Sequence, residues 1–381
     1  MRRFTRAREG FALAIAIFAI VVIGTLIGGI FFASMQQQRM ARNQRLQTNA
    51  IAAAEYGLNR TLSVDWKGTS WNTMPVGGID STSNSYTSHG ATARVRVTRI
   101  GNSNIPMFLV SSEGASGTLL GARARRRTSS VMALVPFDIN LLGALTTRGA
   151  LQMGGSSFIN GTDTNFSGWG CPATGPDLPG VATGDSTLIT TAGCNNWNCV
   201  QGSPPIQQNA AASDTSTYFD YGNGIQWAQL TAMAKLVGTG TVSPAPLAVG
   251  GVCQSGVFTN WGDPARNTPA GACEDYFPIL YSPGNLNLLG GRGQGILLVE
   301  GNLNVAGGFQ FYGPIIVRGD LNTQGTGGHF NGGVMAANVN LAQNVVLGNA
   351  VVTYSSCIMA KVQQATALPI PMVGRPWAEL Y

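Results

Sequence analysis

Residues 11–33 form the longest uninterrupted run of apolar positions in the chain. No charged side chain occurs in this run, and only one threonine and three glycines interrupt its apolar side chains. A helix of that length crosses the hydrocarbon core of a bilayer. The run is longer than the apolar region of a usual signal peptide, and no small-residue cleavage pattern follows it. The pattern therefore predicts a transmembrane helix near the N-terminus.

The helix is expected to continue beyond the membrane. Residues 34–62 contain no proline and are rich in good helix formers. Leu46, Ala50, Ala54 and Leu58 recur every four residues and make one apolar stripe. A single helix over residues 11–62 would be roughly 78 Å long at 1.5 Å per residue. We expect its first half to lie in lipid and its second half to pack the stripe against a globular domain.

Residues 63–136 have the pattern of short strands separated by loops. Apolar and polar side chains alternate over residues 93–98, as in a half-buried strand, and residues 107–112 and 123–135 are further candidates. We expect a small antiparallel sheet that receives the helix stripe. The arginines on these strands are expected to be solvated, with binding of an anionic partner as the alternative.

Residues 284–340 carry an internal repeat. The motif Gly-Asn-Leu-Asn at Gly284 recurs at Gly301, as Gly-Asp-Leu-Asn at Gly319 and as Ala-Asn-Val-Asn at Ala337, in steps of 17, 18 and 18 residues. A short β-rich run precedes each later copy. Repetition at this period is the signature of a solenoid, and the glycines between short strands favour a parallel β-helix.

The repeat also predicts which side chains stack. The third motif position is expected to form an inward apolar ladder of Leu286, Leu303, Leu321 and Val339. The second motif position is expected to form an outward or corner ladder of Asn302, Asp320 and Asn338. Glu300 and Arg318 are 18 residues apart, so they are expected to pair across adjacent rungs. Such an exposed ion pair is worth about 0–1 kcal/mol and serves register more than stability.

All six cysteines are candidate disulfide residues: Cys171, Cys194, Cys199, Cys253, Cys273 and Cys357. An even number of cysteines beyond a membrane anchor indicates disulfides in an oxidising compartment. Cys194 and Cys199 could close a small loop, but the sequence does not choose among the pairings. Zinc is the competing interpretation. With no paired C-x-x-C motif and only 2 histidines, no metal is expected.

The junction before the apolar run has a family resemblance. Four arginines precede Glu9-Gly10, and Phe11 opens the run directly. With the segments Arg8–Leu13, Gln38–Asn43 and Ala53–Leu58, the N-terminal region resembles that of PilX-type minor pilins of type IV pili. The resemblance implies cleavage after Gly10 by the prepilin peptidase and methylation of the new amine of Phe11. An uncleaved single-pass anchor with a cytoplasmic basic end is the alternative.

One position departs from the major pilins. They carry a glutamate at the fifth mature position, where this chain has Ile15. In the family that glutamate pairs with the N-terminal amine of a neighbouring subunit, so its replacement implies a minor, initiating or tip-proximal subunit. Packing between subunits is expected through Gly24, Gly28 and Gly29, because small residues allow helices to approach closely in a membrane.

Charge and motifs narrow the function classes. The formal net charge is +6 and the pI is about 9.1, but the arginines are spread over the leader, helix and strands, so no nucleic-acid partner is expected. No GxSxG, HExxH or P-loop motif occurs, and only 17 residues are acidic. We therefore expect no enzyme, no catalytic residue and no cofactor. A calcium site at residues 161–165 is an alternative with a single carboxylate, too few for calcium.

Together these patterns predict an α+β, mainly β fold with seven segments. They are a leader (1–10), a transmembrane and pilin-like helix (11–62), a small antiparallel β region (63–136), first solenoid strands (137–162), a Cys-rich insertion that covers or caps the solenoid (163–276), the parallel β-helix-like solenoid (277–360) and an extended tail (361–381).

The expected role is that of a minor pilin-like subunit of a type IV pilus. It is expected in the inner membrane with a periplasmic C-terminal domain, and then on the pilus or cell surface. Expected partners are other pilins or pseudopilins through the N-terminal helix, the prepilin peptidase, and a surface or glycan ligand. The alternatives are a pseudopilin of a type II secretion-like system and a membrane-anchored β-helix adhesin or carbohydrate-active protein.

Overall fold

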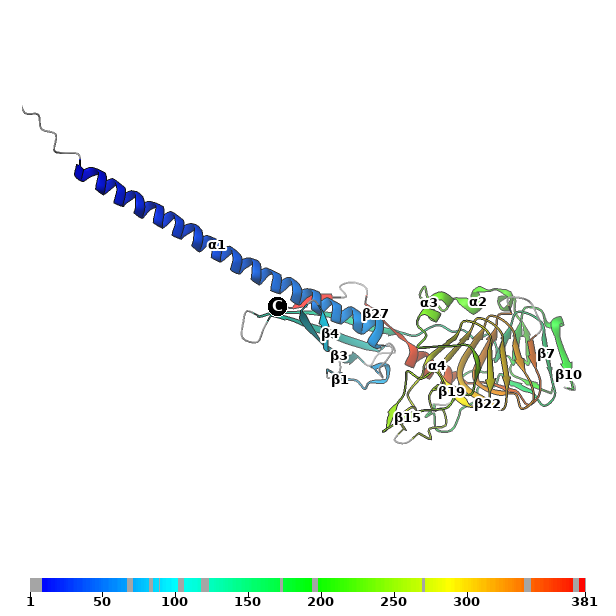
Figure 1. Cartoon of the computed structure of the whole chain (residues 1–381). Helices are drawn as coiled ribbons and strands as arrows, with labels where there is room; N and C mark the ends of the chain where they lie inside the picture. Colours follow the sequence, from blue (N-terminus) through cyan, green and yellow to red (C-terminus); the bar gives the residue numbers. More distant parts are fainter. Residues whose placement is uncertain are drawn as a thin grey trace, which may run out of the picture.

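A long helix, a small antiparallel sheet and a stack of parallel strands make up the protein (Figure 1). The computed structural model describes residues 9–66, 71–81, 85–88, 90–101, 106–117, 123–171, 174–193, 198–268, 271–338, 344–372 and 377–380. The small sheet lies beside the C-terminal half of the helix, and the stack lies beyond the end of the helix (Figure 1). The expectation of an α+β, mainly β fold is confirmed.

Helix α1 runs from Glu9 to Arg60 and continues as a π-helical turn over Thr61–Asp65. Every side chain from Leu13 to Arg45 is exposed. The buried positions begin at Ala50. The predicted change of environment along one helix is therefore present: its first half touches nothing else in the chain, and its second half covers the sheet.

The small sheet has the strand order β1-β3-β4-β5-β27, with β2 beside β3 and β28 beside β5. All of these pairs are antiparallel. The strands are β1 (Ile79–Asp80), β2 (Ser85–Ser88), β3 (Ala91–Gly101), β4 (Met107–Gly117), β5 (Arg123–Val135), β27 (Leu368–Pro371) and β28 (Trp377–Leu380). The predicted extended tail (361–381) is wrong for its first residues, because helix α4 (Ser356–Thr366) extends into it. Beyond that helix the segment supplies two strands of this sheet.

Helix α1 packs against the sheet through two glycines. A Cβ atom at Gly114 would lie 1.9 Å from the carbonyl oxygen of Ala50. A Cβ atom at Gly57 would lie 2.8 Å from the Cβ atom of Ala93. Side chains at these positions would push the helix away from the sheet. Near the helix end, Trp66 meets Trp71 and Phe108 edge to face, with ring centroids 5.1 and 5.3 Å apart.

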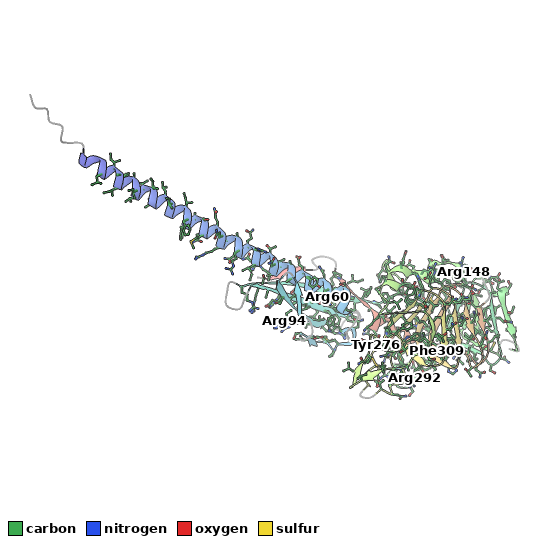
Figure 2. All side chains as sticks on the ribbon, viewed as in Figure 1. Arg60, Arg94, Arg148, Tyr276, Arg292 and Phe309 are labelled. Carbon is green, nitrogen blue, oxygen red and sulfur yellow. A yellow bond between two sulfur atoms is a disulfide. The ribbon has the colours of Figure 1, made fainter. Side chains whose placement is uncertain are left out.

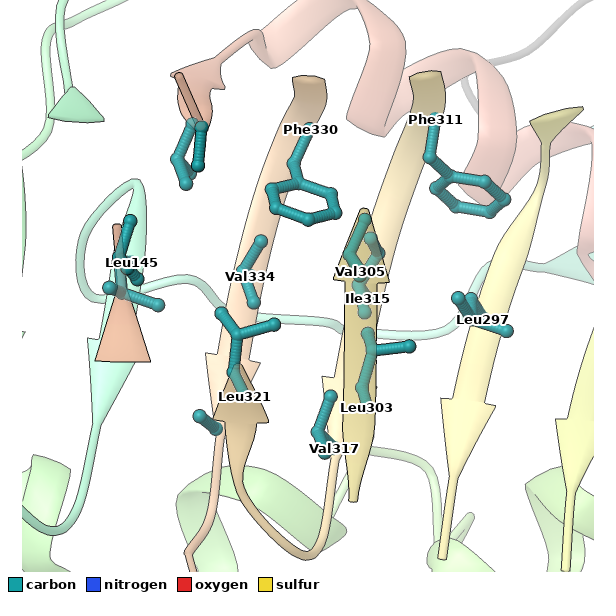
Figure 3. Close-up of a cluster of buried hydrophobic side chains, with 14 of the residues drawn as sticks. Leu145, Leu297, Leu303, Val305, Phe311, Ile315, Val317, Leu321, Phe330 and Val334 are labelled. Carbon is teal, nitrogen blue, oxygen red and sulfur yellow. The ribbon is translucent and has the colours of Figure 1, made fainter. Parts of the chain in front are cut away.

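The stack is a three-sided solenoid of parallel strands. Phe311 and Phe330 fill its interior together with leucines, valines and Ile315 (Figure 3). Phe309 belongs to the same buried cluster. The strands are β6 (Leu145–Thr147), β7 (Leu151–Gly154), β8 (Phe158–Asn160), β9 (Val181–Thr183), β10 (Ile189–Ala192), β11 (Val200–Gln201), β12 (Ile206–Gln208), β13 (Leu236–Val237), β14 (Gly240–Val242), β17 (Ile279–Ser282), β18 (Leu286–Leu289), β19 (Arg292–Gln294), β20 (Ile296–Val299), β21 (Leu303–Ala306), β22 (Phe309–Val317), β23 (Leu321–Thr323), β24 (Gly328–Ala336), β25 (Asn344–Val346) and β26 (Val351–Tyr354).

The two longest strands of the solenoid, β22 and β24, turn one of its corners at glycines. Gly313 in β22 pairs with Gly332 in β24, and both have positive φ angles, 140° and 133°. A Cβ atom at Gly313 would lie 2.0 Å from the carbonyl oxygen of Gly295 on the adjacent rung. Only glycine fits this corner, both for its backbone conformation and for the close approach of the next rung.

The rungs do not stack in the order of the sequence. Strand β6 pairs with β24 on one side and with β9 on the other, so the first strands of the solenoid stack on its last ones. Strands β9 to β12 continue to the far end. Strands β13 and β14 stack on β17 and β18 at the opposite end. Residues 163–276 thus supply both terminal rungs of the solenoid.

The segment between β12 and β13 connects the two ends of the solenoid and runs outside the stack. Helices α2 (Ser216–Phe219) and α3 (Trp227–Ala232) lie along one side of it (Figure 1). A hairpin of β15 (Ala248–Val249) and β16 (Val252–Cys253) follows β14. Helix α4 (Ser356–Thr366) follows β26 and leads from the solenoid back to the small sheet (Figure 1).

Candidate functional site

The exposed half of α1 is the part of the protein that has no partner within the chain. Among the described residues, the helical segment Leu13–Ser63 contains an 18-residue stretch with a mean hydropathy of 2.7, long and apolar enough to cross a membrane. Side chains project from this half on all sides without meeting the rest of the protein (Figure 2). The hydroxyl of Thr25 donates to the carbonyl oxygen of Val22 at 2.9 Å, so this polar group is satisfied inside the helix.

The glycines of this segment are open on every side. At Gly24, Gly28 and Gly29 an added Cβ atom would meet nothing within 4 Å. Gly24 and Gly28 are four residues apart and therefore share a face of the helix. Ile15, which stands where major pilins have a glutamate, is 53% exposed. The segment can therefore make its contacts only with lipid or with another chain.

The predicted processing junction lies in the first turn of α1. The helix begins at Glu9, so the backbones of Gly10 and Phe11 are helical. The four leader arginines lie outside the described residues. Cleavage after Gly10 remains a prediction.

Helix α4 holds the solenoid to the helix and the small sheet. At its N-terminus, the carboxylate of Asp163 accepts hydrogen bonds from the amide of Ser356 at 2.7 Å and from the hydroxyl of Ser356 at 2.5 Å. The same carboxylate also accepts from the amide of Gly175. Asp163 is the one carboxylate of the calcium alternative, and here it caps a helix.

The other end of α4 is held by Asn72, which follows α1. The side-chain amide nitrogen of Asn72 donates to the carbonyl oxygens of Ala365 and Ala367, at 2.6 and 3.0 Å. Its side-chain oxygen accepts from the indole of Trp66 at 2.6 Å. Asn72 thus joins the end of the long helix to the segment that leaves the solenoid. Its sequence context carries no repeat or motif that could have indicated this role.

One disulfide fixes the start of α4, and a second lies in the segment that follows β14. Cys171 is bonded to Cys357 at the start of α4, across 186 residues of sequence. Cys253 is bonded to Cys273. Cys199 is also disulfide-bonded, and Cys194 lies outside the described residues.

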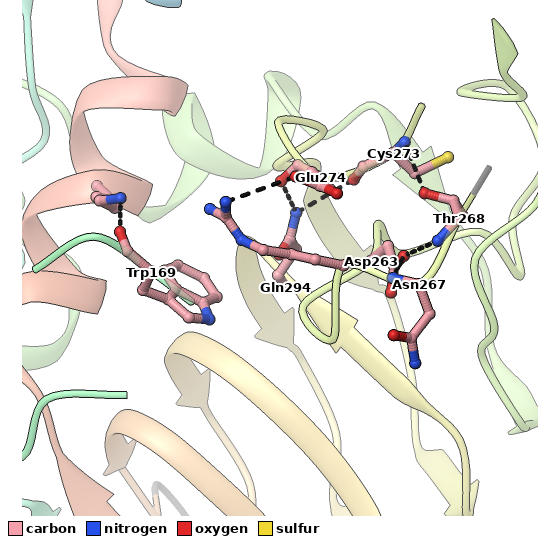
Figure 4. Close-up of polar contacts among 9 residues, drawn as sticks. Trp169, Asp263, Asn267, Thr268, Cys273, Glu274 and Gln294 are labelled. Atoms are coloured by element: carbon pink, nitrogen blue, oxygen red, sulfur yellow. Dashed lines mark hydrogen bonds and ion pairs between the residues drawn. The ribbon is translucent and has the colours of Figure 1, made fainter. Parts of the chain in front are cut away.

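The loop that contains the second disulfide is tied to the solenoid by buried polar contacts. The side-chain amide nitrogen of Gln294 donates to the carbonyl oxygen of Glu274 at 2.7 Å (Figure 4). It also donates to the carbonyl oxygen of Tyr276 at 3.0 Å. The carboxylate of Asp263 accepts from the amides of Asn267 and Thr268, at 2.5 and 2.6 Å (Figure 4). The Gln294 contacts tie the loop to β19, and the Asp263 contacts fix the conformation within the loop.

The inward ladder has leucine at three successive positions. Leu286 pairs with Leu303, and Leu303 pairs with Leu321; these side chains are 1%, 0% and 0% exposed. Val339 lies outside the described residues, and Asn344 occupies the position next to Leu321. The step to Asn344 is 23 residues, longer than the repeat in the sequence.

Asn344 is a buried polar residue inside the apolar ladder. Its side-chain oxygen accepts from the amide of Leu321 at 2.7 Å, and its side-chain nitrogen donates to the hydroxyl of Thr147 at 2.9 Å. Both hydrogen bonds join the last rung of the repeat to its neighbours. The repeat alone could not indicate this residue, because the longer step places it out of phase.

The second motif position lies at a corner of the solenoid. The side-chain oxygen of Asn285 accepts from the amide of Asn302, and that of Asn302 accepts from the amide of Asp320. Asp320 and Asn338 are 8% and 0% exposed, so the ladder is at a corner and not on the outer surface. Burial raises the pKa of Asp320.

Glu300 and Arg318, two charged residues of the solenoid, have structural partners. Arg318 pairs with Glu300 across adjacent rungs, as the sequence predicts. Glu300 also accepts from the indole of Trp227 at 2.8 Å, and the Arg318 guanidinium lies 5.2 Å from the ring centroid of Phe219. Among the described residues, no group of three or more His, Cys, Asp or Glu is placed to hold a metal ion.

Comparisons with known proteins bear on the N-terminal helix. No curated protein matches the sequence of the chain. Among solved structures, the competence-associated pilin ComZ from Thermus thermophilus is similar, with 11% identity, 88% of this chain and 97% of that chain covered, and a TM-score of 0.25. Residues 9–59 match the family model described as PilX N-terminal. The PilX-type resemblance is therefore confirmed over residues 9–59, which make up most of helix α1.

Proposed function

We propose that the chain is a minor pilin-like subunit of a type IV pilus. The observation that carries this proposal is the division of α1: one face of its second half is buried against the sheet, while its first half is apolar, exposed and without a partner in the chain. The family match over residues 9–59 covers both halves. In a pilin, such a helix first anchors the protein in the membrane and then packs against other helices in the filament.

Processing comes first in the proposed sequence of events. The prepilin peptidase cleaves after Gly10 and the amine of Phe11 is methylated. The mature chain stays in the inner membrane through residues 11–33, with its sheet and solenoid in the periplasm. Gly24 and Gly28 then allow the close approach of a neighbouring helix during assembly.

A position near the filament tip fits two features of the chain. Ile15 removes the carboxylate that would pair with the amine of a neighbouring subunit. The solenoid is also far larger than the small sheet, and it is linked to the end of α1 through α4 and Asn72, with the Cys171–Cys357 disulfide at the start of α4. At the tip such a domain has room, and it is presented to partner pilins, surfaces or glycans.

The mature N-terminus is the first test. Mass spectrometry of the protein from the membrane fraction should find a chain that begins with N-methylated Phe11. A chain that retains residues 1–10 would contradict the proposal and leave a membrane-anchored β-solenoid.

Assembly is tested with a matched pair of substitutions in α1. Gly28→Leu should leave membrane insertion intact, because leucine is apolar and favours helix, but it should block close helix packing. Ala19→Leu adds similar bulk on the opposite face, since nine residues correspond to two and a half turns. We expect Gly28→Leu, and not Ala19→Leu, to reduce the protein in sheared surface filaments. Equal recovery of both variants would contradict packing through Gly28.

A further inference from the structure

A cavity of about 380 Å³ lies where the solenoid meets the end of α1 and the small sheet. Its wall is built from segments far apart in the sequence: the turn after α1, the end of α3, the hairpin of β15 and β16, the loop before β17, and the end of α4 with β27. Most side chains in the wall are apolar, among them Leu62, Met233, Phe277 and Leu368. Small-molecule sites usually measure about 300–1,000 Å³, so the cavity is large enough for a small ligand.

Lys235 brings the only positive charge to this wall among the described residues. Its backbone amide donates to the carbonyl oxygen of Ile279 at 2.9 Å, just before β13, which fixes it on the terminal rung of the solenoid. The next residue, Leu236, is buried inside the solenoid, so the side chain of Lys235 points out of the stack. Its ammonium nitrogen lies 5.0 Å from the ring centroid of Tyr276. The charge therefore sits in the cavity, against an aromatic ring.

Tyr276 is held in place on both sides of its ring. Its hydroxyl donates to the carbonyl oxygen of Ser255 at 2.7 Å, and its own carbonyl oxygen accepts from Gln294 at 3.0 Å. Figure 2 shows Tyr276 at the end of the solenoid that lies nearest to the small sheet. The ring cannot turn away without losing these contacts, so this part of the wall is formed before any ligand arrives.

No carboxylate balances the charge of Lys235. Asp275 is the other charged residue of the wall, but the ion pairs of the described residues do not include one between Asp275 and Lys235. The charge of Asp275 acts instead on Lys361 of α4. Burial lowers the pKa of Lys235, and no negative group opposes that effect. A half-buried ammonium without a counter-ion is unfavourable, and an anion bound in the cavity would relieve this cost.

The wall also indicates what kind of anion fits. One ammonium group offers a single positive charge and three N–H donors, which suit one carboxylate. A doubly charged phosphate would find only one cation here, and Asp275 would repel its second charge. A ligand that is polar throughout would lose hydrogen bonds to water against the apolar side chains. The ligand that matches has a carboxylate at one end and an apolar body.

We propose that this cavity binds a small amphipathic monocarboxylate, whose carboxylate pairs with Lys235 and whose apolar body packs against Met233, Phe277 and Leu368. Such a ligand touches the terminal rung of the solenoid and also the segments that lead to the small sheet. Binding therefore strengthens the joint that α4 and Asn72 make between the two parts of the molecule. The site is independent of the exposed half of α1, so it does not rest on the proposed role in a filament.

The test uses the full mature chain in non-ionic detergent micelles, with isotope-labelled methionine methyl groups observed by NMR. Phenylbutyrate is the probe, and phenylbutanol has the same apolar body without the charge. Titration with phenylbutyrate should shift the methyl signal of Met233, which lines the cavity, and not that of Met153 in β7 near the far end of the solenoid. Phenylbutanol should bind much more weakly.

Lys235→Leu should weaken phenylbutyrate binding about 10- to 150-fold, as expected for a lost hydrogen bond to a charged group. It should leave phenylbutanol binding unchanged. Arg96→Leu is the matched control, because it removes one exposed positive charge from β3, away from the cavity. Asp275→Asn should strengthen phenylbutyrate binding, because it removes the negative charge from the wall.

The pH dependence of the wild type gives a test that needs no variant. Phenylbutyrate affinity should fall as the pH rises through the pKa of Lys235, which burial holds below 10.5, because a neutral amine cannot pair with a carboxylate. Tyr276 does not confuse this measurement, since burial raises the pKa of its hydroxyl. Phenylbutanol affinity should stay constant over the same range.

Four results would overturn the proposal. They are an unshifted Met233 signal, equal affinity for phenylbutanol and phenylbutyrate, wild-type affinity in Lys235→Leu, and an equal loss of affinity in Arg96→Leu. If Lys235→Leu failed to fold, the wild-type pH profile would still decide: constant phenylbutyrate affinity up to high pH would exclude pairing with Lys235.

Discussion

The inward ladder of the solenoid can be tested by placing a charge on it. The side chain of Leu303 is fully buried, and Leu303 lies in register between Leu286 and Leu321 (Figure 3). The next residue, Asn304, points outward on the same strand and is exposed. Leu303→Asp and Asn304→Asp therefore introduce the same carboxylate one residue apart, on opposite sides of the sheet.

The expected cost follows from burial. Truncating a buried leucine to alanine costs about 2–5 kcal/mol. An unpaired carboxylate in the interior adds several kcal/mol more, since it loses its hydration. The sum approaches the total stability of a typical domain, about 5–15 kcal/mol. Leu303→Asp should therefore prevent the solenoid from folding, whereas Leu303→Ala should lower its melting temperature by about 4–20 °C.

The assay is thermal unfolding in detergent micelles, followed by circular dichroism. Asn304→Asp removes the hydrogen bond that the Asn304 side-chain nitrogen donates to Asn287 at 2.9 Å, an exposed contact. That loss is worth about 1 kcal/mol, or a shift of about 2–4 °C. If Leu303→Asp melted at the same temperature as Asn304→Asp, position 303 would not be buried and the ladder would be wrong.

Three further predictions concern the joints of the molecule. Gly114→Ala should lower the melting temperature, because its Cβ atom would meet helix backbone and overpacking costs about 1–3 kcal/mol; Gly101→Ala, whose Cβ would meet only a flexible side chain, should cost less. Asn72→Ala should speed amide hydrogen exchange at the C-terminal end of α4, and unchanged exchange would show that Asn72 does not hold that end. Cys171→Ser, Cys357→Ser should lower unfolding free energy by about 2–5 kcal/mol, whereas an unaltered melting temperature would remove the stabilising role of this disulfide.

Local patterns in the sequence were sufficient for much of the fold. The apolar run and the four-residue stripe predicted α1 and the face that it buries, because helix periodicity depends only on nearby residues. The repeat in steps of 17 and 18 residues predicted the register of Leu286, Leu303 and Leu321, because each rung repeats the geometry of the one before it. The pairing of Glu300 with Arg318 followed from the same repeat.

The last step of the repeat is longer than the others, and the residue that stacks there could not be predicted. Asn344 takes the place next to Leu321 after 23 residues, so a fixed period points to the wrong residue. The role of Asn72 was also hidden, because its partners at the end of α4 are more than 290 residues away in the sequence. A single asparagine has no periodicity that could reveal such a contact.

The sequence by itself determined the elements whose physics is local or periodic: the apolar helix, its docking stripe, the strands and the solenoid rung. The tertiary structure decided which elements meet. It placed the first solenoid strands against the last ones, made the C-terminal segment part of the small sheet, and brought arginines of β3 and β5 onto one face. These arrangements depend on contacts between distant segments, and the free energy of such contacts leaves no short-range pattern in the chain.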